Sequence, residues 1–219
     1  MIQNMLDALF PAKLAELCKK MKGGVGEGVK YIVAGGFIAL VLSILKILLA
    51  GVLSGTSGLS VAAAIAAVIG WLVMLIPTII VTYLIVWIAS MLIGALLGGK
   101  AAFPQLFLMF AVFGAGIAVL TGVLGLIVGI IAALSAGIGA LLLMAVSLLV
   151  GLYSLYLAFV VLKSIYGFET MKAVLALIVY LVVSFVVWFV IAMVLAIVLV
   201  MIGLGAYMTA GAAGAIPAY

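Results

Sequence analysis

Long apolar stretches, separated by short segments that carry lysine, make up most of the chain. Residues 1–30 hold eight of the thirteen charged residues, and the other five are spread over the remainder. A helix needs about 20 apolar residues to cross about 30 Å of hydrocarbon. The pattern therefore predicts an all-α, polytopic bundle with five membrane spans, at about residues 31–53, 61–98, 103–132, 138–162 and 173–204.

The second stretch is longer than one crossing requires. At about 1.5 Å per residue, residues 61–98 would form a helix about 57 Å long, and they contain Pro77. This predicts either one tilted helix kinked at Pro77 or a short interfacial helix followed by a span at about 72–97. Two full spans do not fit, because one of them would have only about 15 residues.

Small and polar residues mark the ends of these stretches. Residues 55–60 and 135–139 are rich in glycine and serine and indicate turns. Residues 205–219 are small and uncharged, with Pro217 near the end. They indicate an extended or loosely ordered tail after the last span.

The lysines indicate how the spans are oriented. Short cytoplasmic loops carry an excess of lysine. Five spans place Lys30, Lys100, Lys163 and Lys172 on one side, which predicts a cytoplasmic N-terminus and an extracytoplasmic C-terminus in the cell membrane. The N-terminal residues lack the basic region, apolar core and cleavage site of a signal peptide.

Residues 1–22 have the pattern of an amphipathic helix instead. Lysines occupy the other faces, and Pro11 fits the first turn of a second helix. The segment is predicted to lie on the cytoplasmic leaflet with its lysines toward anionic headgroups. The alternative is a helix packed on the protein's own loops. The apolar residues at helical spacing are Ile2, Met5, Leu6, Leu9, Leu14, Leu17, Cys18 and Met21.

Residues 23–30 are glycine-rich. A phosphate-binding loop would need a preceding strand and a following Gly-Lys-Ser/Thr, and neither is present. The segment therefore predicts a flexible hinge before the first span.

Composition excludes several kinds of chemistry. Hydrophobic residues make up 72% of the chain and charged residues 6%, whereas soluble domains have about 25% charged residues, so the chain is expected to be an integral membrane protein. It has no histidine, no arginine and one cysteine. A Ser-His-Asp triad, a histidine metal site and an internal disulfide are therefore excluded. Because these residue types are missing, we expect no enzyme activity, no cofactor and no metal. We also expect no nucleic-acid partner, because the net charge of +5 comes from scattered lysines.

Lys46 is the one charged residue inside a predicted span. It lies 16 residues after Lys30, or about 24 Å along a helix, in the outer third of the bilayer. An ionisable residue in a membrane is a functional hypothesis by default. Here the side chain either snorkels to the outer interface or has a buried role in packing or ligand contact.

Two further patterns have more than one interpretation. Glycines at GxxxG spacing favour close helix packing, either within the bundle or between copies of the chain or other membrane proteins. Four phenylalanines at helical spacing in the third span indicate a lipid-facing stripe or a partner surface. The glycine pairs are Gly51–Gly55, Gly94–Gly98 and Gly125–Gly129, and the phenylalanines are Phe103, Phe107, Phe110 and Phe113.

The loop sequences resemble a known family. Residues 98–107, GGKAAFPQLF, resemble the "G-G-K-x-x-F-x-Q" stretch that follows the second span of the Ypt-interacting protein (Yip) family. Residues 157–167 with Lys172-Ala173 resemble its "L-K-x-x-Y-G" and "K-A" elements before the fifth span, and residues 10–13 resemble the "P-x-K" of prokaryotic members. The resemblance covers about residues 10–203 and is to short prokaryotic members, because the long acidic region and the "D-L-Y-G-P" motif of eukaryotic members are absent. Eukaryotic members bind prenylated Rab-type GTPases, whereas the short form implies only a five-span membrane protein.

The lysine-containing loops are the candidate interaction surface. They are predicted to dock a protein or to touch lipid phosphates, with Glu169 able to pair with Lys172. The leading hypothesis is a non-enzymatic protein that organises membrane or scaffolds a partner through this face. The alternatives are an accessory subunit of a larger membrane complex and a small-solute transporter or channel. The candidate residues are Lys100, Phe103, Lys163, Tyr166, Phe168, Glu169 and Lys172.

Overall fold

The computed structural model describes residues 1–53, 55, 57–100 and 102–213. Every regular element in this part of the chain is a helix, as predicted. Five of the helices are long and apolar enough to cross a membrane, so the protein is a multi-pass integral membrane protein. The helices are α1 (Ile2–Asp7), α2 (Pro11–Lys20), α3 (Val25–Leu53), α4 (Ser57–Leu97), α5 (Phe103–Leu134), α6 (Ala136–Tyr166) and α7 (Thr170–Ala213).

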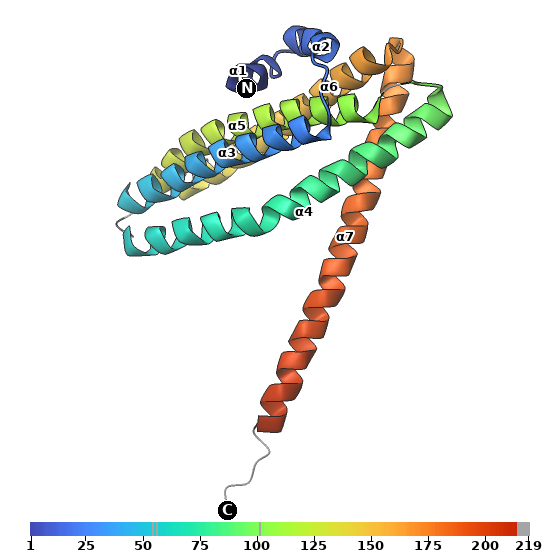
Figure 1. The fold of residues 1–219 in the computed structure, drawn as a ribbon. Coiled ribbons are helices and arrows are strands. Elements are labelled where there is room, and N and C mark those ends of the chain that lie inside the picture. The colour runs from blue at the N-terminus through green and yellow to red at the C-terminus, as the bar shows by residue number, and fades with distance from the viewer. Residues whose placement is uncertain (54, 56, 101, 214–219) are drawn as a thin grey trace, which may run out of the picture.

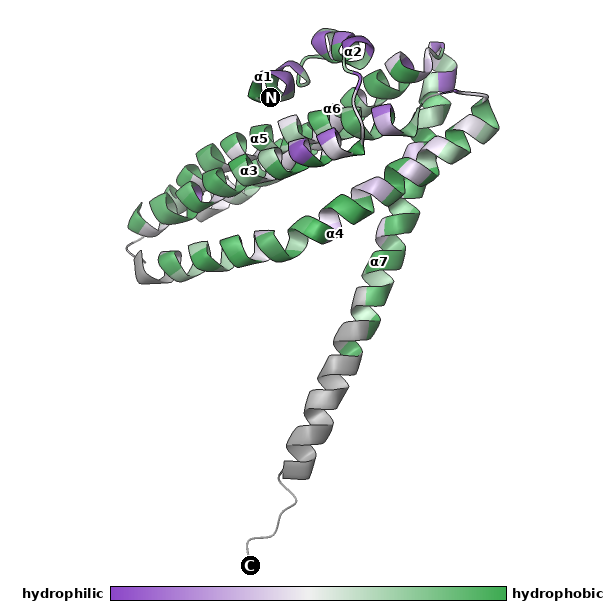
Figure 2. Ribbon diagram, viewed as in Figure 1, coloured by the Kyte–Doolittle hydropathy of each residue, from purple (hydrophilic) through white to green (hydrophobic). Residues whose placement is uncertain are grey.

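Helices α3, α5 and α6 lie along one another, and α1 and α2 cover one side of them (Figure 1). Helix α4 packs on α3 and α5 and crosses α7, which runs away from this group (Figure 1). We call the end where α3 and α5 begin and α4 and α6 end the lysine-bearing end. The polar segments gather there and on α1 and α2, whereas the spans are apolar (Figure 2).

Small residues allow α3 and α5 to approach closely. A Cβ on Gly28 would lie 2.7 Å from Phe107 Cδ1, and a Cβ on Gly35 would lie 2.6 Å from Ala115 Cα. Further along, Gly122 faces Leu42. The contacts advance along both helices in the same direction, so the two helices run parallel, with small residues seven apart on each.

The GxxxG prediction is therefore only partly correct. Gly129 packs against the Lys46 side chain, whereas a Cβ on Gly125 would meet nothing within 4 Å. Gly94 approaches only the Gly99 carbonyl of the following loop, and Gly98 lies in open space. The close helix–helix contacts repeat every seven residues, not every four, because α3 and α5 lie nearly along each other.

The phenylalanines of α5 are core residues. Phe107 is fully buried, and Phe110 and Phe113 are almost fully buried. Phe110 stacks on Tyr180 of α7 with ring centroids 4.6 Å apart. The expectation of a lipid-facing stripe was wrong, because α5 is covered by α1, α2, α3, α4 and α6.

The glycine-rich segment is not a hinge of eight residues. Helix α3 begins at Val25, so only the start of the segment lies outside a helix. Gly28 already packs against Phe107, and a Cβ on Gly23 would lie 2.7 Å from Leu108. Gly23 and Gly28 therefore allow close packing. The helix of the first span begins earlier than predicted, because it extends past the apolar stretch into the glycine-rich segment.

Residues 57–97 form one helix, which settles the alternatives for the second stretch. Helix α4 contains Pro77 and has 41 residues, and it bends along its length (Figure 1). The Thr78 hydroxyl donates to the Met74 carbonyl at 2.7 Å. Threonine thus supplies a hydrogen bond next to the proline, which lacks an N–H.

The last helix is longer than predicted. Helix α7 continues to Ala213, whereas the span was expected to end at 204 and to be followed by a loosely ordered tail. Residues 205–213 contain no proline and no charge that would end a helix. Residues 214–219 lie outside the described residues.

Helices α1 and α2 pack on the bundle. Met5 and Leu14 are buried, and a Cβ on Gly116 of α5 would lie 2.5 Å from the Met5 carbonyl oxygen. Most of their helix contacts are with the spans α5 and α6. Ile2 and Phe10 remain more than half exposed, so an apolar face is still available to lipid.

Hydrogen bonds hold these two helices in place. The Asn4 amide donates to the Tyr31 hydroxyl at 2.9 Å, and the Gln105 amide donates to the Cys18 carbonyl at 2.8 Å. The Tyr153 hydroxyl donates to the carbonyl of Leu9. Three spans therefore contribute polar contacts to the N-terminal helices.

Candidate functional site

The two loops at the lysine-bearing end meet each other. Helix α4 is followed by Gly98 with φ +71°, and α6 by Gly167 with φ +65°. Glycine accepts this left-handed conformation after a helix without a steric penalty. A Cβ on Gly99 would overlap the Tyr166 ring and lie 2.7 Å from Phe168 Cζ, so residues 98–100 and 166–169 form one surface.

Aromatic rings form the centre of this surface. Tyr166 and Phe168 stack with centroids 5.0 Å apart and an interplanar angle of 10°. The Tyr166 hydroxyl is buried and has no hydrogen-bond partner in the described part of the chain. Phe103 lies against Tyr83 of α4, with centroids 5.0 Å apart. The structure thus joins Gly99 of the first loop to the candidates Tyr166 and Phe168, while Phe103 packs on α4 from the first turn of α5.

The charged candidates surround these rings and are exposed. The Lys163 ammonium donates to Thr170 Oγ1 at 3.0 Å and lies 5.9 Å from the centroid of the Phe159 ring. Lys100 and Lys172 point into solvent-accessible space.

The expected pair between Glu169 and Lys172 is not among the ion pairs of the described residues. Both residues are exposed, and an ion pair in water gains little over separate hydration. The Glu169 carbonyl instead accepts the Ala173 N–H at 2.9 Å at the start of α7. At the start of α7, Thr170 is the residue that accepts a hydrogen bond from a lysine, Lys163. No sequence pattern indicated this role for Thr170.

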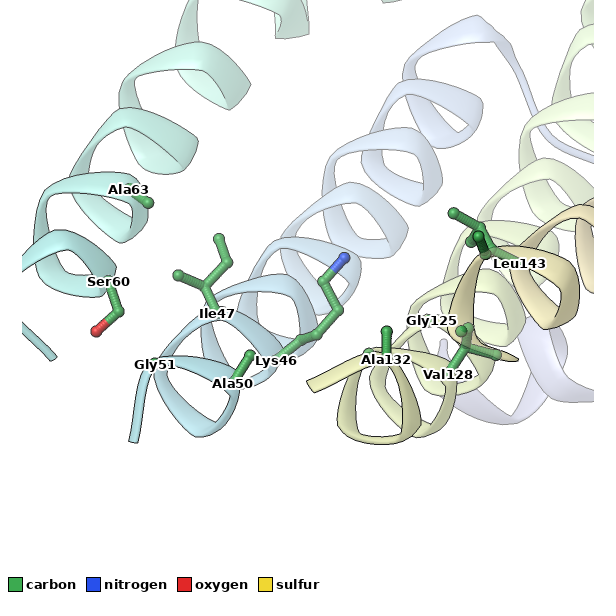
Figure 3. A pocket seen from close by; sticks show the side chains of 13 residues that line it. Lys46, Ile47, Ala50, Gly51, Ser60, Ala63, Gly125, Val128, Ala132 and Leu143 are labelled. Carbon is green, nitrogen blue, oxygen red and sulfur yellow. The ribbon is translucent and has the colours of Figure 1, made fainter. Parts of the chain in front are cut away.

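The opposite end of the bundle contains a hollow around Lys46. Its volume is about 640 Å³. The Lys46 side chain reaches from α3 toward the part lined by α5 (Figure 3). The lining is otherwise apolar or small, except for Ser60 of α4. The remaining lining residues are Ile47, Ala50, Gly51, Ala63, Gly125, Val128, Gly129, Ala132, Gly139, Ala140 and Leu143.

The geometry around Lys46 bears on the packing alternative. Its aliphatic stem packs on α5, because a Cβ on Gly129 would lie 2.5 Å from Lys46 Cγ and 2.6 Å from Cδ. The ammonium continues into the hollow. The packing role was foreseen from the charge alone, but the hollow was not, since small residues of four helices create it together.

A second hollow lies between α3, α4 and α5. Its volume is about 320 Å³, and its lining includes Trp71, Thr78 and Gly114. The Trp71 ring packs edge-on against Phe37 at 6.2 Å between centroids. No charged residue lines this hollow in the described part of the chain.

Comparison with known proteins adds no relative. No protein-family model matches the chain, and no curated protein or solved structure is similar to it. The fold defines the class, a multi-pass integral membrane protein with five candidate spans. Its two ends differ chemically, since exposed lysines surround stacked rings at one end and a single lysine enters an apolar hollow at the other.

Proposed function

We propose that the protein is a non-enzymatic membrane protein that organises membrane or scaffolds a partner through its lysine-bearing end, which faces the cytoplasm. The observation that supports this most is the contact of Gly99 with Tyr166 and Phe168. It unites two loops into one surface with exposed lysines around stacked rings. The loop motifs that resemble the Yip family fall on this same surface.

The physical properties of the surface suit a partner with an acidic face. Lys100, Lys163 and Lys172 are exposed in the segments that carry Tyr166 and Phe168 or meet them, and Glu169 is exposed beside Phe168. Aromatic rings contribute large contact area, and exposed charges accelerate and orient association. The same lysines favour the cytoplasmic side of a bilayer.

Photo-crosslinking in native membranes tests this proposal. A photoreactive residue at position 100 or 163 is expected to capture one discrete protein, and the same residue at position 141, exposed at the other end of the bundle, is not. Replacing Lys100 and Lys163 with alanine is expected to abolish capture from a photoreactive residue at position 168. Undiminished capture by a double variant that is fully inserted in the membrane would contradict the proposed docking function.

An accessory subunit of a larger complex is the second candidate, and the exposure of α7 favours it. Phe185, Trp188, Phe189 and Met193 are each more than half exposed, and their spacing puts them on one face of the helix. This face of α7 is therefore exposed, whereas Val187 and Ile191 pack against the core. A stoichiometric complex in mild detergent, with crosslinks from position 189 but not from position 100, would favour this candidate over the first.

A further inference from the structure

Lys46 has no acid within reach. The chain contains four acids. Asp7, Glu16 and Glu27 pair with Lys13, Lys20 and Lys30, and Glu169 lies in the α6–α7 loop. All four are at the lysine-bearing end or on the N-terminal helices, whereas Lys46 lies at the other end. No acidic side chain of the protein is therefore placed to neutralise the Lys46 ammonium, and an anion from outside the chain can take that role.

At the depth of Lys46 in the membrane, pairing with an anion lowers the free energy of the charged side chain. It lies seven residues before the end of α3 at Leu53, or about 10 Å along the helix. A cation at this depth is costly unless it is paired or reaches water. Its stem is held against Gly129, so the ammonium is directed into the hollow instead of along the outside of the bundle.

The hollow has the size and lining of a binding site. Its volume of about 640 Å³ falls in the range of about 300–1,000 Å³ that is common for ligand pockets. Glycine and alanine from α5 and α6 form much of its wall, which leaves room beside the ammonium. A Cβ on Gly125 would meet nothing within 4 Å, so this wall position borders empty space.

We propose that this hollow binds the anionic phosphate headgroup of a membrane lipid from the leaflet at that end, with Lys46 as its counter-ion. The wall is almost entirely apolar apart from Lys46 and Ser60. A soluble anion would lose its hydration there in exchange for a single cation. A lipid brings its own acyl chains, which match the apolar wall. The lipid site is independent of the docking function proposed for the other end.

Native mass spectrometry of the full-length protein in mild detergent tests the proposal. The probes are phosphatidylglycerol, which is anionic, phosphatidylcholine, which is zwitterionic, and inorganic phosphate. The wild type is expected to retain phosphatidylglycerol about tenfold more tightly than phosphatidylcholine, because a charge-assisted contact contributes that much. Equal retention of the two lipids, or displacement of phosphatidylglycerol by an equal concentration of inorganic phosphate, would overturn the proposal.

Two variants locate the binding. Lys46→Met removes the charge and keeps the stem, and Gly125→Leu fills the hollow and keeps the charge. Both are expected to reduce the preference for phosphatidylglycerol to near that for phosphatidylcholine. Lys19→Met removes an equal charge from exposed α2, and Gly114→Leu enlarges a second open glycine of α5 in the uncharged hollow.

The two control variants are expected to keep the wild-type preference. Retention by Lys46→Met or Gly125→Leu at the wild-type level contradicts the site. An equal loss in Lys19→Met or Gly114→Leu also contradicts it, because the lipid would then respond to total charge or general packing. The thermal unfolding of all four proteins is measured in parallel, and only variants that unfold within a few degrees of the wild type are compared.

Discussion

Gly129 of α5 lies directly against the side chain of Lys46 of α3, and a Cβ there would be 2.5 Å from Lys46 Cγ. The neighbouring glycine of the same helix, Gly125, would meet nothing within 4 Å. Two glycines four residues apart therefore have different roles. One makes room for a lysine stem, and the other borders the hollow that the lysine enters.

Replacing Gly129 with valine is expected to destabilise the protein by about 1–2 kcal/mol, because the Lys46 stem must move aside. Gly125→Ala is the matched control and is expected to be neutral or stabilising by up to about 1 kcal/mol, since alanine favours a helix over glycine. Unfolding in sodium dodecyl sulfate, followed by tryptophan fluorescence, measures both. Equal destabilisation by the two variants would contradict the distinction.

Replacing Gly35 with valine is expected to cost more, about 3 kcal/mol. The new side chain would meet the backbone of Ala115, whose Cα would lie 2.6 Å from the Cβ, and a backbone cannot turn aside as a lysine does. Gly114→Val, at a neighbouring glycine of α5 with nothing within 4 Å of an added Cβ, is the control and should change little. The same unfolding titration ranks the three valine variants, and a smaller cost for Gly35→Val than for Gly129→Val would refute this ranking.

The reactivity of Cys18 reports whether α2 is docked. Burial raises the pKa of the Cys18 thiol to about 12, and the thiolate is the reactive form. The rate of labelling by a maleimide is therefore expected to be slow at pH 8 and to rise about tenfold per pH unit well beyond pH 9, because the folded-state pKa is still above the pH.

Leu14→Asp places a charge at a fully buried position of α2 and should release the helix. The pKa of Cys18 then returns toward its ordinary value of about 8.5, so labelling is faster at pH 8 and levels off above about pH 9. Ala12→Asp, at an exposed position of the same helix, should label as the wild type does. A common pH profile for the three proteins would show that α2 does not shield the thiol.

Gly99→Val is expected to separate the two loops of the lysine-bearing end, because its side chain would occupy the space of the Tyr166 and Phe168 rings. We expect a loss of about 1–3 kcal/mol in the free energy of unfolding. Crosslinking from position 100 should weaken as well. Gly24→Val is the control, since Gly24 has nothing within 4 Å. Unchanged crosslinking by a destabilised Gly99→Val variant would show that the contact between the loops is not required for docking.

Labelling of single cysteines from either side of the membrane tests the orientation. In a Cys18→Ala background, Lys100→Cys and Ser135→Cys are expected to react from opposite compartments, because α5 connects them (Phe103–Leu134). The lysine-bearing side is expected to be cytoplasmic. If both positions react with a membrane-impermeant reagent added to one side, α5 does not span the membrane as proposed.

The five spans were predictable because a lipid environment demands long apolar stretches and tolerates few charges. Their ends were less predictable. Helix α3 begins at Val25 and α7 ends at Ala213, because a helix continues past the apolar region until a residue such as proline interrupts it. The end of the second span was placed to within a residue, since α4 ends at Leu97 and Gly98 follows with φ +71°.

The inside of the bundle was largely hidden in the sequence. Hydrophobic residues face both lipid and protein in a membrane, so the spacing of Phe107, Phe110 and Phe113 carried no information about burial. The packing of Gly28 and Gly35 on α5 depends on two small-residue patterns seven apart on separate helices. Gly122 and Gly129 show the same spacing on the partner helix, and a search for paired heptads would have found them.

The attachment of Leu9 to Tyr153, and of Met5 to the helix of Gly116, has a consequence for biosynthesis. The ribosome releases the first twenty residues long before it makes the third and fourth spans. Until those spans enter the bilayer, the surface that buries Met5, Leu14 and Cys18 has not formed. The newborn amino-terminal helices must therefore wait at the membrane or be shielded by a chaperone, and they dock only after more than half of the polypeptide has been translated.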